Sequence, residues 1–366
     1  MTRHYIIPIF VPHFGCPHDC IFCNQKKITG LSTNVTSVEV EDIIKEHLKY
    51  FKKDSFIEIA FYGGSFTAID INIQRQLLAI PYKYKQAGLV NEIRLSTRPD
   101  AIDSDILENR KDSGVNTIEL GCQSLSDEVL NNSNRGHTSV DVYKSAEMIQ
   151  DYGFNLGLQM MLGLPGDSLE DSLYTALEFI KLKPYCVRIY PTLVIKETYL
   201  EKLYFDNLYS PLSLEDSIDI TTPILILFYL NNINVIRVGL QPTDNIQLGK
   251  DVVTGPFHPA YRQLVESNIF KKIIDNYLES NNIQTKNGTM IIEAENKSIS
   301  NIAGQKSSNI LYLKQKYSFN NIKIFSKNVD DEYLDITIGK EIYRLNIRNE
   351  MKKIISNNST FNNLIN

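Results

Sequence analysis

The chain has 366 residues, of which 43% are hydrophobic and 22% are charged. This composition is typical of globular proteins and excludes a disordered or collagen-like chain. The formal net charge of −5 excludes a generally basic nucleic-acid-binding protein, and no apolar run reaches the ~18–20 residues that a membrane-spanning helix needs.

Short runs of β-forming residues alternate along the chain with amphipathic segments. The runs predict strands at residues 5–11, 56–62, 92–96, 117–121, 155–161, 186–190 and 234–239. The amphipathic segments predict helices at residues 38–53, 71–85, 104–111, 140–152 and 169–182. Strands that alternate with helices form parallel sheets. We therefore predict an α/β fold, a partial (β/α)6 TIM-like barrel.

The second half of the chain predicts the rest of this domain and a small module. The apolar stretch 223–230 predicts a buried helix, and a last helix at about residues 260–279 completes a domain at residues 1–280. After a polar linker, strand and helix patterns in the order β-α-α-β-β predict a small α+β module at residues 288–350. The Asn-rich residues 351–366 predict a frayed tail.

Polar or glycine-rich motifs follow nearly every predicted strand. They are Gly63-Gly64-Ser65-Phe66, Ser96–Asp100, Gly121–Ser124, Gly163–Gly166 and Pro191-Thr192. In barrels of this kind the chemistry lies in the loops at the carboxyl ends of the strands, which predicts one active site at this rim. The alternative is that glycine and proline only mark the strand ends.

Three of the five cysteines, Cys16, Cys20 and Cys23, form a C-x3-C-x2-C triplet after the first predicted strand. Clustered cysteines in an odd number, without a signal peptide, indicate metal ligands in the reducing cytoplasm. Three thiolates in one loop suit a [4Fe–4S] cluster with one iron open to a further ligand. Zinc held by the three cysteines with His13 or His18, or three structural thiols, are the alternatives.

Two further cysteines, Cys122 and Cys186, lie on predicted strands. We interpret Cys186 as a small buried hydrophobic residue, and Cys122 as either a core or a rim residue. His137 and His258 lie in predicted loops, where a proton-transfer role and a surface or capping role both remain open.

The triplet, with Phe22 directly before Cys23, resembles the cluster loop of the radical S-adenosylmethionine (radical SAM) enzymes. The resemblance implies a [4Fe–4S] cluster on Cys16, Cys20 and Cys23, whose open iron chelates S-adenosylmethionine. It also implies a radical SAM type of barrel and a reducing electron donor such as flavodoxin or ferredoxin. One electron then cleaves the sulfonium and releases a 5′-deoxyadenosyl radical, which takes a hydrogen atom from substrate.

The rim motifs resemble the family's cofactor contacts residue by residue. The resemblance also implies that Phe22 contacts the cofactor. Gly63 and Gly64 resemble the glycine pair whose backbone meets the methionyl amino group, with Ser65 where the family often has glutamate. Gln123 resembles a glutamine that contacts the ribose or the carboxylate.

Three further rim residues complete the set that the resemblance implies. Arg135 resembles an arginine that pairs with the methionyl carboxylate. Ser96 stands where related enzymes commonly have glutamate, and Gln159 where some have aspartate, so these two depart from the pattern. No residue is assigned to the chemical step on substrate.

Six stretches resemble the catalytic subunit of Elongator and its prokaryotic relatives: 96–102, 119–124, 127–130, 135–138, 161–166 and 188–195. This resemblance implies an RNA-modifying enzyme that acts on transfer RNA uridine. The residues after Glu279 do not resemble the acetyltransferase domain of that subunit. Two alternatives stay open: an enzyme similar to oxygen-independent coproporphyrinogen oxidases, acting on a small molecule, and a non-catalytic iron–sulfur protein that binds RNA.

The small module resembles a degenerate KH domain, in which a G-x-x-G loop between two helices clamps a nucleic-acid backbone. Here the loop is Gly304–Ser307, with Ser307 in place of the second glycine and Lys306 placed to face a phosphate. Residues 281–366 carry 12 Lys and Arg against 8 Asp and Glu. This local positive balance favours a polyanionic partner, whereas a lid with solvated lysines is the alternative.

Overall fold

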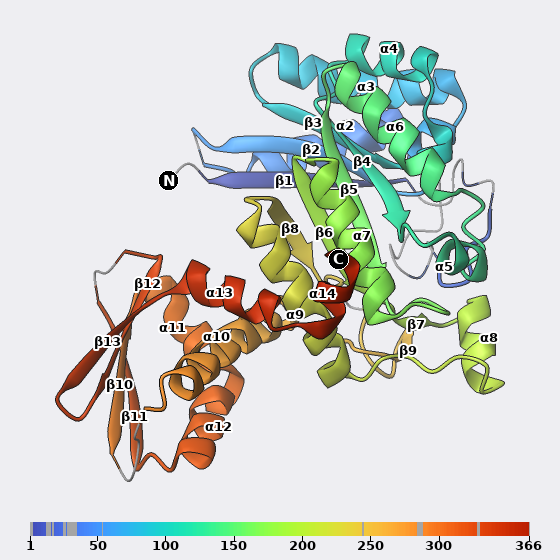
Figure 1. The fold of residues 1–366 in the computed structure, drawn as a ribbon. Helices are drawn as coiled ribbons and strands as arrows, with labels where there is room; N and C mark the ends of the chain where they lie inside the picture. The colour runs from blue at the N-terminus through green and yellow to red at the C-terminus, as the bar shows by residue number, and fades with distance from the viewer. Residues whose placement is uncertain are drawn as a thin grey trace.

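A curved sheet of seven parallel strands forms the larger part of the molecule (Figure 1). The structure is a computed structural model that describes residues 3–11, 16, 18–24, 27, 35–52, 54–243, 245–283, 288–327 and 330–365. In sheet order the strands are β1 (His4–Val11), β2 (Phe56–Gly63), β3 (Glu92–Thr97), β4 (Thr117–Gln123), β5 (Asn155–Leu162), β6 (Cys186–Pro191) and β8 (Asn234–Val238). Strands β1 and β8 are the two edges, so the barrel is partial, as predicted.

The predicted helices connect these strands and cover the outer face of the sheet (Figure 1). They are α2 (Ser37–Leu48), α3 (Ile71–Gln86), α4 (Ser104–Asp112), α6 (Ser139–Asp151) and α7 (Leu169–Lys181). The side chains of Thr36, Thr138 and Ser168 cap α2, α6 and α7 in capping boxes, which explains where these helices begin. Helix α2 ends five residues earlier than predicted, and Phe51 beyond it stacks on Tyr5.

Short elements of the barrel were not predicted from the sequence. They are the 3-10 turns Phe66–Ala68 and Pro99–Ala101, the helices α5 (Asp127–Asn132) and α8 (Tyr199–Phe205), and the two-stranded sheet of β7 (Val194–Ile195) and β9 (Val252–Thr254). Elements of two to seven residues give too few periodic positions for a pattern to reveal them.

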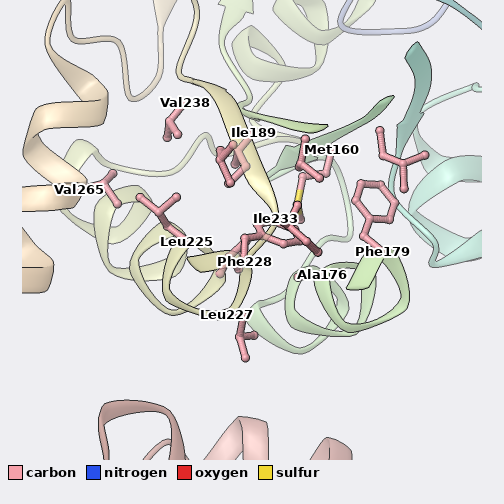
Figure 2. Packing of buried hydrophobic residues seen from close by; sticks show 14 of the residues in the cluster. Met160, Ala176, Phe179, Ile189, Leu225, Leu227, Phe228, Ile233, Val238 and Val265 are labelled. Atoms are coloured by element: carbon pink, nitrogen blue, oxygen red, sulfur yellow. The ribbon is translucent and has the colours of Figure 1, made fainter. Parts of the chain in front are cut away.

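The apolar segment of α9 (Leu214–Leu230) forms the centre of the core, as predicted (Figure 2). Leu225 and Phe228 of this helix are fully buried together with Ile189 of β6 and Phe179 of α7. Within the described part of the chain, no helix is both long enough and apolar enough to cross a bilayer.

The C-terminal module is a four-stranded sheet with helices on one face (Figure 1). Helix α10 (Tyr261–Ser280) precedes the module. The elements of the module before its last strand are β10 (Thr289–Ala294), a 3-10 turn (Asn296–Ser298), α11 (Ile299–Ala303), a second 3-10 turn (Gln305–Ser307), α12 (Ser308–Tyr317), β11 (Asn321–Ser326) and β12 (Tyr333–Ile338). The strand β13 (Glu341–Asn346) was not predicted; it pairs with β12 across a two-residue turn. Strand β10 pairs with β11 in parallel, and the connection between them contains α11 and α12. The Gly304–Ser307 loop lies between these two helices.

The prediction of a frayed tail was wrong. Residues 347–365 form the helices α13 (Ile347–Ser356) and α14 (Ser359–Ile365). Ile347, Met351, Ile354 and Ile355 recur at helical spacing and pack into the core, and α13 lies against α9 and α10. The Asn-rich composition suggested disorder, but this apolar stripe decides the conformation.

Candidate functional site

The loop with the three cysteines follows β1 and is held from two sides. Ile21 donates its backbone N–H to the carbonyl of Ser133 (3.3 Å) and accepts from Leu200 (2.7 Å). Within the loop the backbone N–H of Cys23 donates to the carbonyl of Cys20 (3.0 Å). Gly15 and Pro17 of the motif, and the alternative ligand His13, lie outside the described residues.

Two buried arginines lie beside Cys20. Arg135 Nη1 is 3.1 Å from Cys20 Sγ, and its Nη2 donates to the carbonyl of Gly121 (2.6 Å). Arg98 Nη1 lies 3.9 Å from the same sulfur, while its guanidinium binds both oxygens of Asp100 and the carbonyl of Arg135. The loop therefore meets two fixed positive charges. Arg98 belongs to the rim motif Ser96–Asp100, but the sequence analysis did not predict it as a site residue.

The pKa of Cys16 is set by the same surroundings. Burial raises the pKa of this thiol and Cys20 adds to the rise, whereas a hydrogen bond from the Ser65 backbone and the charges of Arg98 and Arg135 lower it. Cys16 and Cys20 thus interact with each other and with the two arginines. The cysteine loop therefore lies near the carboxyl ends of β3 and β4.

The turn after β2 lies directly against the end of β1. Gly63 has φ +114°, and a Cβ there would be 2.7 Å from the carbonyl oxygen of Val11, so only glycine fits. Gly64 donates its N–H to that same carbonyl (2.9 Å). The hydroxyl of Ser65 hydrogen-bonds to Thr97 (2.9 Å) and accepts the N–H of Arg98 (3.2 Å), so it ties β2 to β3.

Gln123, Gln159 and Arg135 converge on Gly121 at the end of β4. The register of β4 and β5 shifts between Gly121 and Gln123, and Gln123 has φ +71°. Gln159 donates its amide to Gln123 Oε1 (3.2 Å). A non-glycine residue in the left-handed region costs about 1–3 kcal/mol and is concentrated at functional sites. Ser96 is half-buried on the neighbouring strand β3.

Phe22 connects the cysteine loop to a neighbouring part of the barrel. It packs with Ile21 against Val194 and Leu200 in a small hydrophobic cluster. Its contacts in the structure anchor the cysteine loop to the β7 and α8 region.

A buried ion-pair network fills the interior of the half-barrel below this rim. Glu119 on β4 accepts from Arg94 Nη1 (2.6 Å) and Arg188 Nε (2.6 Å), and Arg94 Nε also donates to Glu58 (2.7 Å). Cys186 Sγ lies 3.3 Å from Arg94, so this cysteine is buried, as predicted, but in polar surroundings. The sequence analysis missed the network because its partners are 25 to 69 positions apart.

Toward the rim, the ion-pair network contacts two tyrosines. Arg188 Nη2 donates to the hydroxyl of Tyr62 (2.6 Å), and Arg188 Nη1 to that of Tyr190 (3.3 Å). Residues two apart on a strand face the same side, so Tyr62 points to the interior like Glu58. The charged network is thus the floor of the half-barrel, and the half-buried Tyr62 and Tyr190 lie above it. Ser96 and Gln159, also half-buried, are the register partners of Glu119 and Arg188.

Two family models match the chain in the regions that carry this geometry. A model of the radical SAM superfamily matches residues 10–178, and a model of the radical SAM C-terminal domain matches residues 184–271. The chain belongs to the radical SAM superfamily. Its seven-stranded half-barrel agrees with the fold that the sequence predicted.

The chain is similar to parts of several curated proteins. The chain is 30% identical over 209 residues to an uncharacterised protein of Methanocaldococcus jannaschii, covering 54% of this chain and 64% of that protein. It is 28% identical over 255 residues to the tRNA uridine(34) acetyltransferase of the same organism, covering 59% and 47%. With Elongator complex protein 3 of Homo sapiens it shares 33% identity over 150 residues, covering 40% and 27%. The chain thus spans about a quarter to two thirds of these relatives.

One solved structure resembles nearly the whole chain. Elp3 of Methanocaldococcus infernus with an N-terminal deletion superposes with a TM-score of 0.59 at 17% identity, covering 96% of this chain and 76% of that one. At this identity the likeness concerns the fold. It extends beyond the radical SAM half-barrel into the C-terminal module.

The radical SAM family implies an iron–sulfur cluster, and the donor set of the cysteine loop fits one. Three soft thiols come from one loop beside Arg135, whose buried Nε has no hydrogen-bond partner among the described residues. In the described part of the chain, no three His, Cys, Asp or Glu side chains are grouped so that they could hold a metal ion. His18 Nε2 lies 3.9 Å from Asp100 Oδ2.

His137 lies buried behind the site and carries a prediction about pH. Its Nε2 faces the carbonyl of Cys122 (3.2 Å), and burial, aided by Arg135 and Arg98, lowers the pKa of His137 to about 3. Cys122 itself is fully buried, as its core interpretation predicted. An unfolded histidine titrates near about 6.5, so between these values only the unfolded chain binds the proton.

Stability is therefore expected to fall as the pH drops from about 6.5 toward about 3, by up to about 1.4 kcal/mol per pH unit from this residue. A His137→Gln variant keeps a donor for the carbonyl of Cys122 and is expected to show a shallower slope. Urea unfolding of both proteins at pH 7, 6 and 5 gives the slope of the unfolding free energy against pH. Equal slopes for both proteins would contradict the depressed pKa.

Proposed function

We propose that this chain is a radical SAM enzyme that modifies transfer RNA, with a [4Fe–4S] cluster held by Cys16, Cys20 and Cys23. When bound, the cluster and S-adenosylmethionine supply one-electron cleavage of the sulfonium and a 5′-deoxyadenosyl radical. The observation that supports the proposal is the convergence of the cysteine loop, two arginines and the glycine turn at one rim.

The chain's own residues have distinct tasks in this proposal. Gly63 and Gly64 let the backbone approach the cofactor closely, and Gln123 with Gln159 offers amide groups to its polar parts. Arg135 holds the thiolate of Cys20 with Nη1 and has Nε left to reach a carboxylate. Arg98 fixes the carbonyl of Arg135 and thereby its position. The buried ion pairs close the interior below and exclude water from that side.

The RNA substrate is proposed from the names of the relatives and from the C-terminal module. The relatives include two proteins named tRNA uridine(34) acetyltransferase from the genus Methanocaldococcus, and Elongator complex protein 3. Lys306 is exposed in the loop between α11 and α12, at the place where a KH domain has its clamp.

The loop has a fixed backbone conformation. Gly304 has φ +75°, Lys306 +52° and Ser307 +61°. The amide of Asn309 donates to the carbonyl of Ser267 (2.8 Å) and also contacts those of Asn301 and Ile302, which holds the start of α12 against α10. A backbone clamp needs such rigidity, and the exposed Lys306 supplies its charge.

The lysines of the module divide into two groups. Lys297, Lys316, Lys327 and Lys353 form ion pairs with neighbouring carboxylates. Within the part of the chain that the structure describes, Lys306, Lys314, Lys323, Lys340 and Lys352 do not. Three of these five lie on the loop, α12 and β11.

The test measures 5′-deoxyadenosine formed by anaerobically reconstituted, reduced protein with S-adenosylmethionine, with and without transfer RNA from cells that lack this gene. We expect formation to rise with the RNA. A Lys306→Gln variant should raise the RNA concentration needed for half-maximal rate, whereas Lys340→Gln, an exposed lysine on the β12–β13 turn, should not.

Other results point to the alternatives. Cleavage that ignores RNA favours a small-molecule substrate; the chain is also 25% identical over 184 residues to the heme chaperone HemW of Lactococcus lactis, covering 50% of this chain and 48% of that protein. An intact cluster with no cleavage at all favours a non-catalytic iron–sulfur protein that binds RNA.

A further inference from the structure

A pocket of about 330 Å³ lies where β8 ends and α10 begins. Its walls come from two segments, 236–242 and 258–266, that have no part in the site described above. Strand β8 is the edge of the half-barrel opposite β1, so the pocket lies across the sheet from the cysteine loop (Figure 1).

The walls of the pocket are fixed. Gly239 has φ +83°, and a Cβ there would lie 2.9 Å from Cβ of Tyr261, so the chain passes close against that tyrosine. The hydroxyl of Tyr261 hydrogen-bonds to Thr221 (2.8 Å) and to Ser217 of α9. Val238 and Val265 beneath the pocket belong to the core (Figure 2). The pocket is therefore preformed.

Among the described residues, the charged groups in the wall leave hydrogen-bond donors and no unpaired carboxylate. Glu266 is the one acid among the lining residues that the structure describes. Its Oε1 accepts from Arg262 (2.8 Å) and Tyr229 (3.0 Å), and its Oε2 from Asn301 (2.8 Å). Arg262 also donates to the carbonyl of Val235 (2.8 Å). These two residues neutralise each other as a structural pair.

Besides the Arg262–Glu266 pair, His258 and Arg237 supply hydrogen-bond donors to the pocket. The backbone N–H of Ala260 donates to His258 Nδ1 (3.0 Å), so in the neutral ring Nε2 carries the proton. Arg237 uses one nitrogen, Nη2, for Gln241 (2.7 Å). Among the described residues, Arg237 Nε and Nη1 and His258 Nε2 have no hydrogen-bond partner. The amide of Gln263 adds a further donor.

We propose that this pocket binds a phosphate group. A fixed cavity with a guanidinium, an imidazole N–H and no unpaired carboxylate matches an anion with several acceptor oxygens, and guanidinium fits phosphate geometrically. Its volume is within the range of small-ligand pockets and admits a nucleotide. The phosphate belongs either to an RNA backbone, which rests on the proposed function, or to a small phosphorylated molecule, which does not.

The experiment uses the full chain and two probes, a transfer RNA transcript and uridine 5′-monophosphate. Arg237→Gln removes the charge, and Arg237→Lys restores it. His258→Asn removes the Nε2 donor but keeps an acceptor for the N–H of Ala260. Arg75→Gln, an exposed arginine on α3, is the control. We expect Arg237→Gln to weaken binding about tenfold, as expected for one lost charged hydrogen bond, and Arg237→Lys to recover part of it.

Loss of transfer RNA affinity in Arg237→Gln, with a lower salt dependence and no binding of the mononucleotide, supports an RNA phosphate. Loss of mononucleotide affinity with unchanged RNA binding supports a small phosphorylated ligand. If both probes bind Arg237→Gln and His258→Asn as they bind the wild type, or if neither probe binds the wild type, the proposal is wrong. Because binding is measured without S-adenosylmethionine, this test does not depend on whether the protein carries out the radical chemistry.

Discussion

Replacing Cys20 by alanine is expected to abolish the iron–sulfur absorbance of the reconstituted protein and to reduce 5′-deoxyadenosine formation to the level without protein. The variant removes one of three proposed cluster ligands, and a loop with two thiols cannot hold the cluster in the same way. It also removes the sulfur that Arg135 approaches at 3.1 Å. Iron and sulfide analysis, visible absorbance and product formation are measured on the same sample.

The matched control is Cys122→Ala. Cys122 is fully buried on β4 and its pKa is raised to about 12 by burial, so it is an inert thiol of the core. This variant should keep the cluster and the product formation of the wild type. A Cys20→Ala protein that keeps its iron, its colour and its activity would exclude the proposed cluster loop. Stoichiometric zinc in the wild type would instead favour the zinc alternative.

The fold of the half-barrel could be predicted because its signals are local. Each strand is a short apolar run, and each helix repeats apolar residues at three- and four-residue spacing, as in α7 with its buried Leu173, Ala176 and Phe179. The same reasoning failed where the signal was short or masked by composition. Strand β13 has one buried residue, Leu345, and α13 was hidden by the asparagines that follow it.

The site could be predicted only as far as its motifs are contiguous. The three cysteines are close in sequence, and the glycine turn 63–64 follows a strand. Arg98 gave a weaker signal: it lies in the motif after β3, yet its task depends on Asp100, Arg135 and Cys20 in space. The packing of Phe22 could not be predicted either, because it depends on residues about 170 to 180 positions away.

The ion pairs inside the half-barrel are the clearest case of a feature that only the fold creates. Glu58, Arg94, Glu119 and Arg188 come from the four strands β2, β3, β4 and β6, and their side chains meet only in the folded interior. Burial alone would raise the pKa of Glu119, but the charges of Arg188 and Arg94 lower it, so this carboxylate stays ionised.

Replacing Glu119 by glutamine is therefore expected to lower the free energy of unfolding by about 3–5 kcal/mol. The change leaves the buried guanidinium of Arg188 without its counter-charge and removes one of the two carboxylates that Arg94 contacts. Urea unfolding at pH 7 measures this change. Glu46→Gln is the control: Glu46 pairs with Lys49 on the exposed surface of α2, and its loss should change stability by less than about 0.5 kcal/mol.

The size of the Glu119 effect also tests what the network does. If Glu119→Gln loses only as much stability as Glu46→Gln, water reaches the arginines and the floor of the half-barrel is open. If the loss is large, the charged layer is dry and the space for cofactor and substrate ends above it, at the level of Tyr62 and Tyr190. A radical formed at the rim then has protein, not water, on its lower side, which is the condition for directing it to one substrate atom.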